Sequence, residues 1–132
     1  MLVDVQETQT DTEGVWGDYQ EGVRFRIARA GNRQFLRAAD RIDAPYKKQI
    51  SRGKLSTEKQ IDNLCKAMAE AILLDWEGIA TADGDLPYST DNAYAVLRHN
   101  PDVRDFVAEF SGQVENYRTE SIKKTAKKSQ TG

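Results

Sequence analysis

The chain has 132 residues, of which 39% are hydrophobic and 30% are charged. This length predicts a single domain, which at this size buries a core without metal or disulfide support. Cys65 is the only cysteine, so an intrachain disulfide is excluded and a reducing compartment is favoured. There is no run of about 18 apolar residues and no signal-peptide pattern, so we expect a cytosolic protein with no membrane contact.

Charge is unevenly distributed along the chain. The net charge is −2, yet residues 1–22 contain six Asp or Glu and no Lys or Arg. The remaining residues hold nineteen basic and fifteen acidic side chains, a net charge of +4. Residues 1–14 carry too few apolar side chains to offset the entropy lost on ordering, and they are predicted to form a flexible acidic arm.

A strand is predicted shortly after this arm. Val23, Phe25 and Ile27 alternate with Arg24 and Arg26, which is the period of a half-buried strand. A single strand needs a partner, and residues 15–18 are the nearest candidate. The sequence therefore predicts a short N-terminal β-hairpin or strand.

Helical periodicity follows. The spacing predicts a helix over residues 32–43, which Pro45 stops. A loop is expected over residues 45–55. The strongest pattern predicts a central core helix over about residues 57–78, with Leu64 and Trp76 among the apolar positions that recur at three- and four-residue steps.

Two further helices are predicted towards the C-terminus. Ser89 is a favourable cap for the first, and Pro101 stands in the favoured first position of the second. The predicted fold is mainly α, a single small domain of four to five helices with a short N-terminal hairpin or strand. It spans residues 15–118, and residues 119–132 are expected to form a basic, frayed tail.

No pattern in the sequence predicts catalysis. His99 is the only histidine and has no nucleophile or carboxylate at a characteristic spacing. One His and one Cys are too few for a structural zinc site. Residues 83–85 contain an Asp-Gly turn, but a calcium loop centred on Gly84 would need carboxylates where Ile79 and Thr90 stand. We therefore expect no catalytic residue, no metal and no cofactor.

Arginines recur every four residues around the first predicted helix. They are Arg29, Arg33, Arg37 and Arg41, which line one face if the helix begins early enough. Such a stripe is a candidate docking site for an acidic partner or a nucleic acid. The alternative is an ordinary solvated face opposite the apolar one, which is what amphipathic helices normally present. The acidic arm of the same or a neighbouring chain is a further candidate occupant.

The order of short motifs resembles a known family. A Leu-Asp-Trp-Glu-Gly-Ile segment at residues 74–79 is followed by Asp83-Gly84 and by Leu-Pro-Tyr-Ser at residues 86–89. A short helix through Ala93 and a helix starting at Pro101 come next. This order resembles the tail assembly chaperones of lambda-like siphophages and related prophages, over roughly residues 23–128.

The resemblance implies a function that periodicity does not show. Members of that family are not enzymes. They bind the tape measure protein and help to recruit tail tube subunits during tail assembly. They act in the cytoplasm of the bacterial host and are not kept in the mature virion. The resemblance thus implies the tape measure protein and the tail tube protein as partners, and self-association into multimers is expected from the opposite charges of arm and tail.

Two other function classes are compatible with the residues. A small nucleic-acid-binding regulator would use the arginine stripe and the lysines of the tail, with affinity that falls steeply with salt. The acidic net charge and the lack of a helix-turn-helix signature disfavour it. A small enzyme would need clustered titratable groups in a deep pocket, which the single His and single Cys do not suggest.

Overall fold

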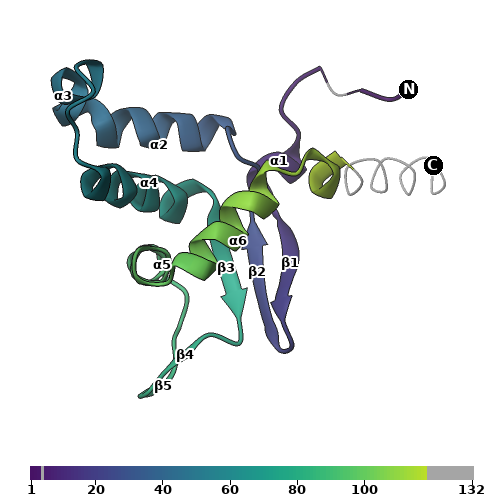
Figure 1. The fold of residues 1–132 in the computed structure, drawn as a ribbon. Helices are drawn as coiled ribbons and strands as arrows, with labels where there is room; N and C mark the ends of the chain where they lie inside the picture. Colours follow the sequence, from purple (N-terminus) through teal and green to yellow (C-terminus); the bar gives the residue numbers. More distant parts are fainter. Residues whose placement is uncertain (4, 119–132) are drawn as a thin grey trace.

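The computed structural model describes residues 1–3 and 5–118, and these residues form an α/β fold (Figure 1). A three-stranded antiparallel sheet has the order β1-β2-β3, and β4 and β5 form a separate two-stranded hairpin. In chain order the elements are α1 (Gln9–Glu13), β1 (Val15–Gln20), β2 (Val23–Ile27), α2 (Arg33–Asp43), the 3-10 helix η1 (Ala44–Tyr46), α3 (Lys47–Ser51), α4 (Thr57–Ala71), β3 (Leu73–Glu77), β4 (Ala80–Thr81), β5 (Gly84–Asp85), α5 (Thr90–His99) and α6 (Pro101–Gly112).

The N-terminal hairpin is present, with Val15 opposite Ile27 and Trp16 opposite Arg26. Period-two alternation sets the two faces of β2. Val23, Phe25 and Ile27 are buried, whereas Arg24 and Arg26 are only partly covered. One face of the sheet therefore meets the core and the other carries charge.

The mainly α prediction is wrong, because the predicted central helix does not run to Gly78. It ends at Ala71, and residues 73–77 form β3, which pairs antiparallel with β2. The apolar residues of this stretch can be buried on one face of either a helix or a strand. Pairing decides the outcome, since β2 would otherwise leave a row of backbone groups without partners. The predicted turn at Asp83-Gly84 lies in a short hairpin, in which residues 82–83 connect β4 to β5 and Gly84 is the first residue of β5.

Hydrogen bonds to the segment after β5 hold β3 in place. The indole Nε1 of Trp76 donates to the carbonyl oxygen of Leu86 at 2.9 Å. The hydroxyl of Tyr88 donates to the carbonyl oxygen of Leu73 at 2.7 Å, and the two rings meet edge to face. The segment before α5 thus covers β3, and these bonds require the extended conformation at residues 73–77.

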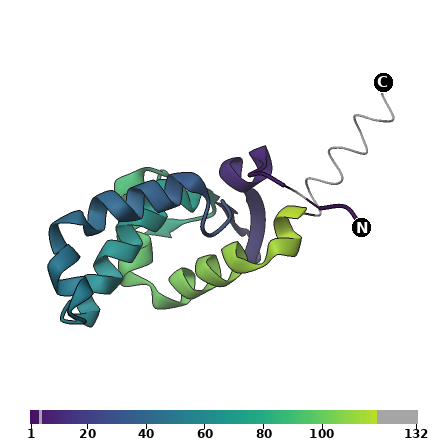
Figure 2. The same cartoon turned by 90° about the horizontal axis from the view of Figure 1, so that it is seen from above.

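The core lies between the sheet and helices α4, α5 and α6 (Figure 2). Phe25 and Ile27 of the sheet are fully buried, as are Leu97 of α5 and Val107 of α6. Further aromatic rings extend this core, because Tyr19 packs edge to face against Phe25 and Phe106.

Helices α2 and α4 lie side by side and, with α3, extend away from the sheet (Figure 1). Caps fix where both helices begin. The side chain of Asn32 accepts from the Phe35 amide at 2.9 Å and donates to the carbonyl oxygen of Ala71 at 3.1 Å. Ser56 caps α4 by accepting from the Lys59 amide at 3.1 Å. Asn32 thereby joins the start of α2 to the end of α4.

Within the predicted flexible arm, residues 9–13 instead form helix α1. Its cap is reciprocal, because the Thr8 hydroxyl accepts from the Asp11 amide and the Asp11 carboxylate accepts from the Thr8 amide, both at 3.2 Å. The side chain of Asp11 is buried and lies 3.5 Å from the Arg29 guanidinium. These contacts stabilise the folded conformation of residues 9–13, which composition alone did not predict. The basic tail predicted at residues 119–132 lies outside the described residues.

Candidate partner-binding groove

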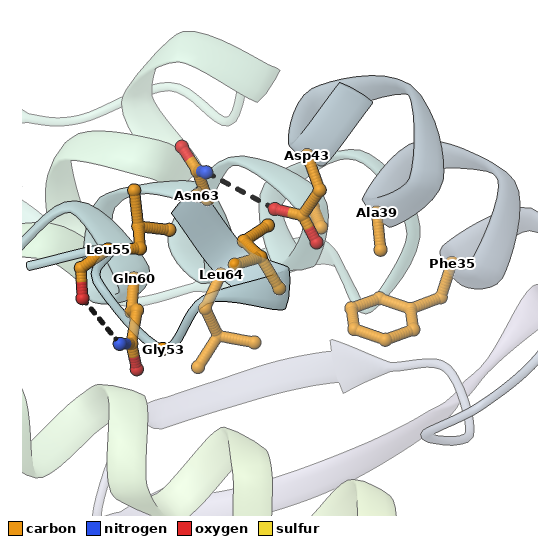
Figure 3. A pocket seen from close by; sticks show the side chains of 10 residues that line it. Phe35, Ala39, Asp43, Gly53, Leu55, Gln60, Asn63 and Leu64 are labelled. Atoms are coloured by element: carbon orange, nitrogen blue, oxygen red, sulfur yellow. Dashed lines mark hydrogen bonds between the residues drawn. The ribbon is translucent and has the colours of Figure 1, made fainter. Parts of the chain in front are cut away.

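An apolar groove runs between α2 and α4 and encloses about 420 Å³ (Figure 3). One wall comes from Phe35 and Ala39 of α2, and the other from Leu64 and Ala67 of α4. These residues are spaced by four on one helix and by three on the other, so each pair lies on one face of its helix. We refer to this feature as the α2–α4 groove.

The far end of the groove is built by the connection between the two helices. Ile50 of α3 and Leu55 of the following loop line it. The Gln60 side chain donates from Nε2 to the Leu55 carbonyl oxygen at 2.8 Å, which holds this loop against α4. Ile50 and Leu64 each remain 43% exposed. Large apolar side chains are therefore within reach of a second molecule.

One polar contact crosses the groove. The Asn63 side chain donates from Nδ2 to Oδ1 of Asp43 at 3.2 Å (Figure 3). Its own Oδ1 atom is buried and has no hydrogen-bond partner among the described residues. A buried acceptor without a partner is costly to stability, and because this atom is closed off from solvent, a molecule bound in the groove does not reach it.

Basic side chains surround the groove. Residues 33–56 contain seven Lys or Arg and two Asp, a net charge of +5. Two of these cations are paired locally, because Arg41 binds Glu70 of α4 and Lys47 lies 3.8 Å from Asp40. Arg52 and Lys54 are exposed and alternate with Gly53 and Leu55, which line the groove. We refer to residues 33–56 as the basic arm.

The structure separates the four arginines of the predicted stripe. Arg29 precedes α2 and faces Asp11, while Arg33, Arg37 and Arg41 lie on α2. Arg33 and Arg37 are exposed and form no ion pair with any described residue, whereas Arg41 is tied to Glu70. The stripe therefore begins at Arg33, where Asn32 caps the helix.

A second cluster of charge joins α4 to α5 outside the groove. Asp62 lies 3.2 Å from the Lys66 ammonium and 3.3 Å from that of Lys59, and the Tyr94 hydroxyl donates to it. Arg98 of α5 is 3.8 Å away. The Tyr94 hydrogen bond, followed by the two lysines, lowers the pKa of Asp62 to about 2. This cluster connects two helices.

Titratable groups elsewhere are dispersed. In the described part of the chain, no group of three or more His, Cys, Asp and Glu side chains is placed to hold a metal ion. Cys65 is fully buried in the core, where desolvation raises the pKa of its thiol. His99 is exposed at the end of α5. No helix of the described residues has the length and apolarity needed to cross a membrane.

Sequence reasoning predicted the helices that line the groove but not the groove itself. It placed Leu64 in the core and residues 45–55 in a loop, so neither Ile50 nor Leu55 was a candidate. Both are large apolar residues within a mostly polar connection, and this pattern could have indicated an exposed apolar surface.

Fold and groove together define a small α/β domain with an open apolar groove and a basic arm. A family model described as YdaY prophage protein matches residues 30–128, more than half of the chain. The chain thus belongs to the YdaY prophage protein family. Neither a curated protein nor a solved structure matches it. The matched region includes the α2–α4 groove and begins after β2.

Proposed function

We propose that this prophage protein is a tail assembly chaperone that acts by non-covalent binding and catalyses no reaction. In this proposal it holds the tape measure protein and helps to recruit tail tube subunits in the cytoplasm of the bacterial host. It needs no cofactor and leaves before the virion is mature. Membership of a prophage protein family supports a role in a bacteriophage or prophage. The resemblance in the order of motifs at residues 74–101 supports the tail assembly chaperones as the class of protein.

The observation that carries the proposal is the α2–α4 groove. An apolar groove between two helices is a common way to bind an amphipathic helix, whose anchors follow i, i+3, i+4 and i+7 spacing. A tape measure protein is long and helical, so it offers many such segments. Several copies bound along one client would gain from avidity even when each contact is weak.

The exposed cations of the basic arm favour a second candidate, a nucleic-acid-binding regulator. Arg33 and Arg37 are among the exposed side chains of the basic arm that would contact phosphates. This function predicts affinity that falls steeply as salt rises. It does not use the apolar lining of the groove, which is why we rank it second.

The test is co-expression with the tape measure protein of the same prophage. We expect this chain to increase the soluble fraction of the tape measure protein and to co-purify with it. The variant Leu64→Glu places a charge in the groove at a position that is 43% exposed, and it should abolish both effects while folding normally. The matched control is Val114→Glu, because Val114 is 41% exposed and lies outside the groove.

Two results would contradict the proposal. The first is a tape measure protein that stays insoluble whether or not the chain is present. The second is capture that Leu64→Glu and Val114→Glu retain equally, which would place binding outside the groove. A DNA titration at rising salt then tests the regulator, with Arg33→Glu as the variant expected to weaken it.

A further inference from the structure

Basic side chains are concentrated at one end of the α2–α4 groove. Residues 47–55, which comprise α3 and the connection to α4, contain four Lys or Arg and no Asp or Glu. Ile50, Gly53 and Leu55 of the same stretch line the groove. Cations and apolar lining therefore alternate along one short segment. We refer to residues 47–55 as the α3 end of the groove.

Most of the positive charge at the α3 end is not neutralised by an acidic neighbour. Lys47 lies 3.8 Å from Asp40. Lys48, Arg52 and Lys54 are exposed and form no ion pair with any residue that the structure describes. Like charges gathered on one short segment repel one another, which destabilises the folded chain. An acidic partner at the α3 end would relieve this repulsion.

The acidic N-terminal region contacts the opposite end of α2. The carboxylate of Glu7 accepts from the backbone amide of Arg33 at 2.7 Å, and Asp11 lies 3.5 Å from the Arg29 guanidinium. The eleven residues of α2 separate these contacts from α3 by about 16 Å. Figure 1 likewise shows α1 and α3 at opposite ends of α2. These contacts therefore do not neutralise the cations of the α3 end.

Large apolar side chains along the groove are left partly open. Ile50 and Leu64 are each 43% exposed. Leu36, which follows Phe35 on α2, is 57% exposed and extends the apolar surface beyond the groove. A partner that inserts apolar side chains between α2 and α4 would bury this surface. The surface thus calls for a partner that combines apolar anchors with acidic side chains.

We infer that the α2–α4 groove takes an amphipathic helix that is acidic beside its apolar stripe. The apolar anchors enter between Phe35 and Leu64, and Asp or Glu side chains of the partner lie against Arg52 and Lys54. This inference rests on the proposed function, because it names the kind of tape measure segment that the groove selects. A basic helix buries the same apolar area but brings like charge to the α3 end, so charge sets the preference.

Two matched synthetic helices test the inference. Both carry the same leucines at helical spacing and exceed about 15 residues, the length above which isolated helices form. Glu and Gln fill the polar positions of one peptide, and Lys and Gln fill those of the other. Circular dichroism checks that the two peptides are equally helical. Fluorescence anisotropy of the labelled peptides then measures Kd for each on the full chain.

In low salt we expect the acidic peptide to bind about tenfold more tightly than the basic one, since several exposed ion pairs, each weak, act together. In 1 M salt the difference should largely disappear, because the Debye length is then about 3 Å. The variant Leu64→Glu should prevent binding of both peptides, which shows that they use the groove.

Two double variants with the same change in net charge separate the α3 end from the overall field of the protein. Arg52→Glu/Lys54→Glu reverses the charge at the α3 end and should abolish or invert the preference. The control is Arg33→Glu/Arg37→Glu. Each of these arginines stands two residues from Phe35 and so about 160° away around α2, and this variant should keep most of the preference. Circular dichroism checks that both variants are folded.

Three results would overturn the inference. They are equal binding of the two peptides, tighter binding of the basic peptide, and a preference that both double variants lose equally. Binding of neither peptide, together with self-association that Leu64→Glu abolishes, would assign the groove to a second copy of the chain instead.

Co-expression with the tape measure protein is a separate readout, so the two proposals fail separately. Capture through the groove with no difference between the peptides would leave the chaperone proposal and remove this inference. A clear acidic preference without capture would leave the selectivity of the groove and remove the chaperone proposal.

Discussion

Asp62 shows how a single residue organises two helices. It lies on α4, accepts from Tyr94 of α5, and has Lys59, Lys66 and Arg98 within 4 Å. The Tyr94 hydrogen bond, and after it those of Lys66 and Lys59, stabilise the charged form of the carboxylate, which is why its pKa falls. The cluster ties α5 to the same helix that forms one wall of the groove.

Asp62 makes stability depend on pH. Its pKa drops from 3.8 to about 2 on folding, so its contribution is complete well above pH 3.8 and is lost as pH falls through about 2. We expect Asp62→Asn to reduce the free energy of unfolding by about 1 kcal/mol at pH 6, since water screens part of the interaction. At pH 2, where about half of the folded molecules still carry the charge, the difference should fall to less than half of its value at pH 6.

Urea unfolding at the two pH values measures this effect. The control is Asp105→Asn, because Asp105 is exposed and has no ion pair within residues 1–3 and 5–118. A difference between the unaltered protein and Asp62→Asn that is as large at pH 2 as at pH 6 would show that Asp62 acts through packing and not through its charge.

At the scale of elements, the three-stranded sheet depends on the turn that follows β3. Gly78 has a φ of +81°, and a Cβ atom there would lie 1.9 Å from the carbonyl oxygen of Gly22. Gly22 has nearly the same φ, +79°, but open space around it. The two glycines thus separate the cost of backbone conformation from the cost of a steric clash.

We expect Gly78→Ala to destabilise the protein by about 3 kcal/mol, because the left-handed conformation and the clash add together. Gly22→Ala should cost about 1 kcal/mol, from the conformation alone. Thermal or urea unfolding of both variants measures the difference. Equal losses would mean that β3 and the β1–β2 turn move apart easily, and that the close approach at Gly78 is not required.

At the scale of the whole molecule, a hydrogen bond links the C-terminal part of the described chain to the sheet. The Tyr117 hydroxyl donates to the carbonyl oxygen of Ile27 at 3.0 Å, across 90 residues of sequence. Tyr117 is almost fully buried, and desolvation raises the pKa of its hydroxyl. Its ring also meets Phe110 edge to face, so residues 114–118 close the core from one side.

Tyr117→Phe should lower the free energy of unfolding by about 1–2 kcal/mol, because the Ile27 carbonyl loses a buried donor while the ring packing remains. Tyr19→Phe is the control, since the Tyr19 hydroxyl makes no hydrogen bond within the described part of the chain. A loss no greater than that of Tyr19→Phe would imply that water replaces the missing hydroxyl.

Local patterns determined much of this protein. Alternation at Val23, Phe25 and Ile27 specified a strand, and the cap at Ser89 specified where a helix begins. These features depend on interactions between residues that are close in the sequence, so they can be predicted from the sequence alone. Four-residue spacing likewise put Arg33, Arg37 and Arg41 on one helix.

Tertiary structure decided the rest. Residues 73–77 fit a helical stripe, but β2 needed a strand partner, and long-range pairing outweighed local periodicity. Leu64 fits a core position by spacing, yet it remains exposed because α2 stands far enough from α4 to leave a groove. The distance between two helices depends on how side chains from several distant segments pack together, and no local sequence pattern predicts that packing.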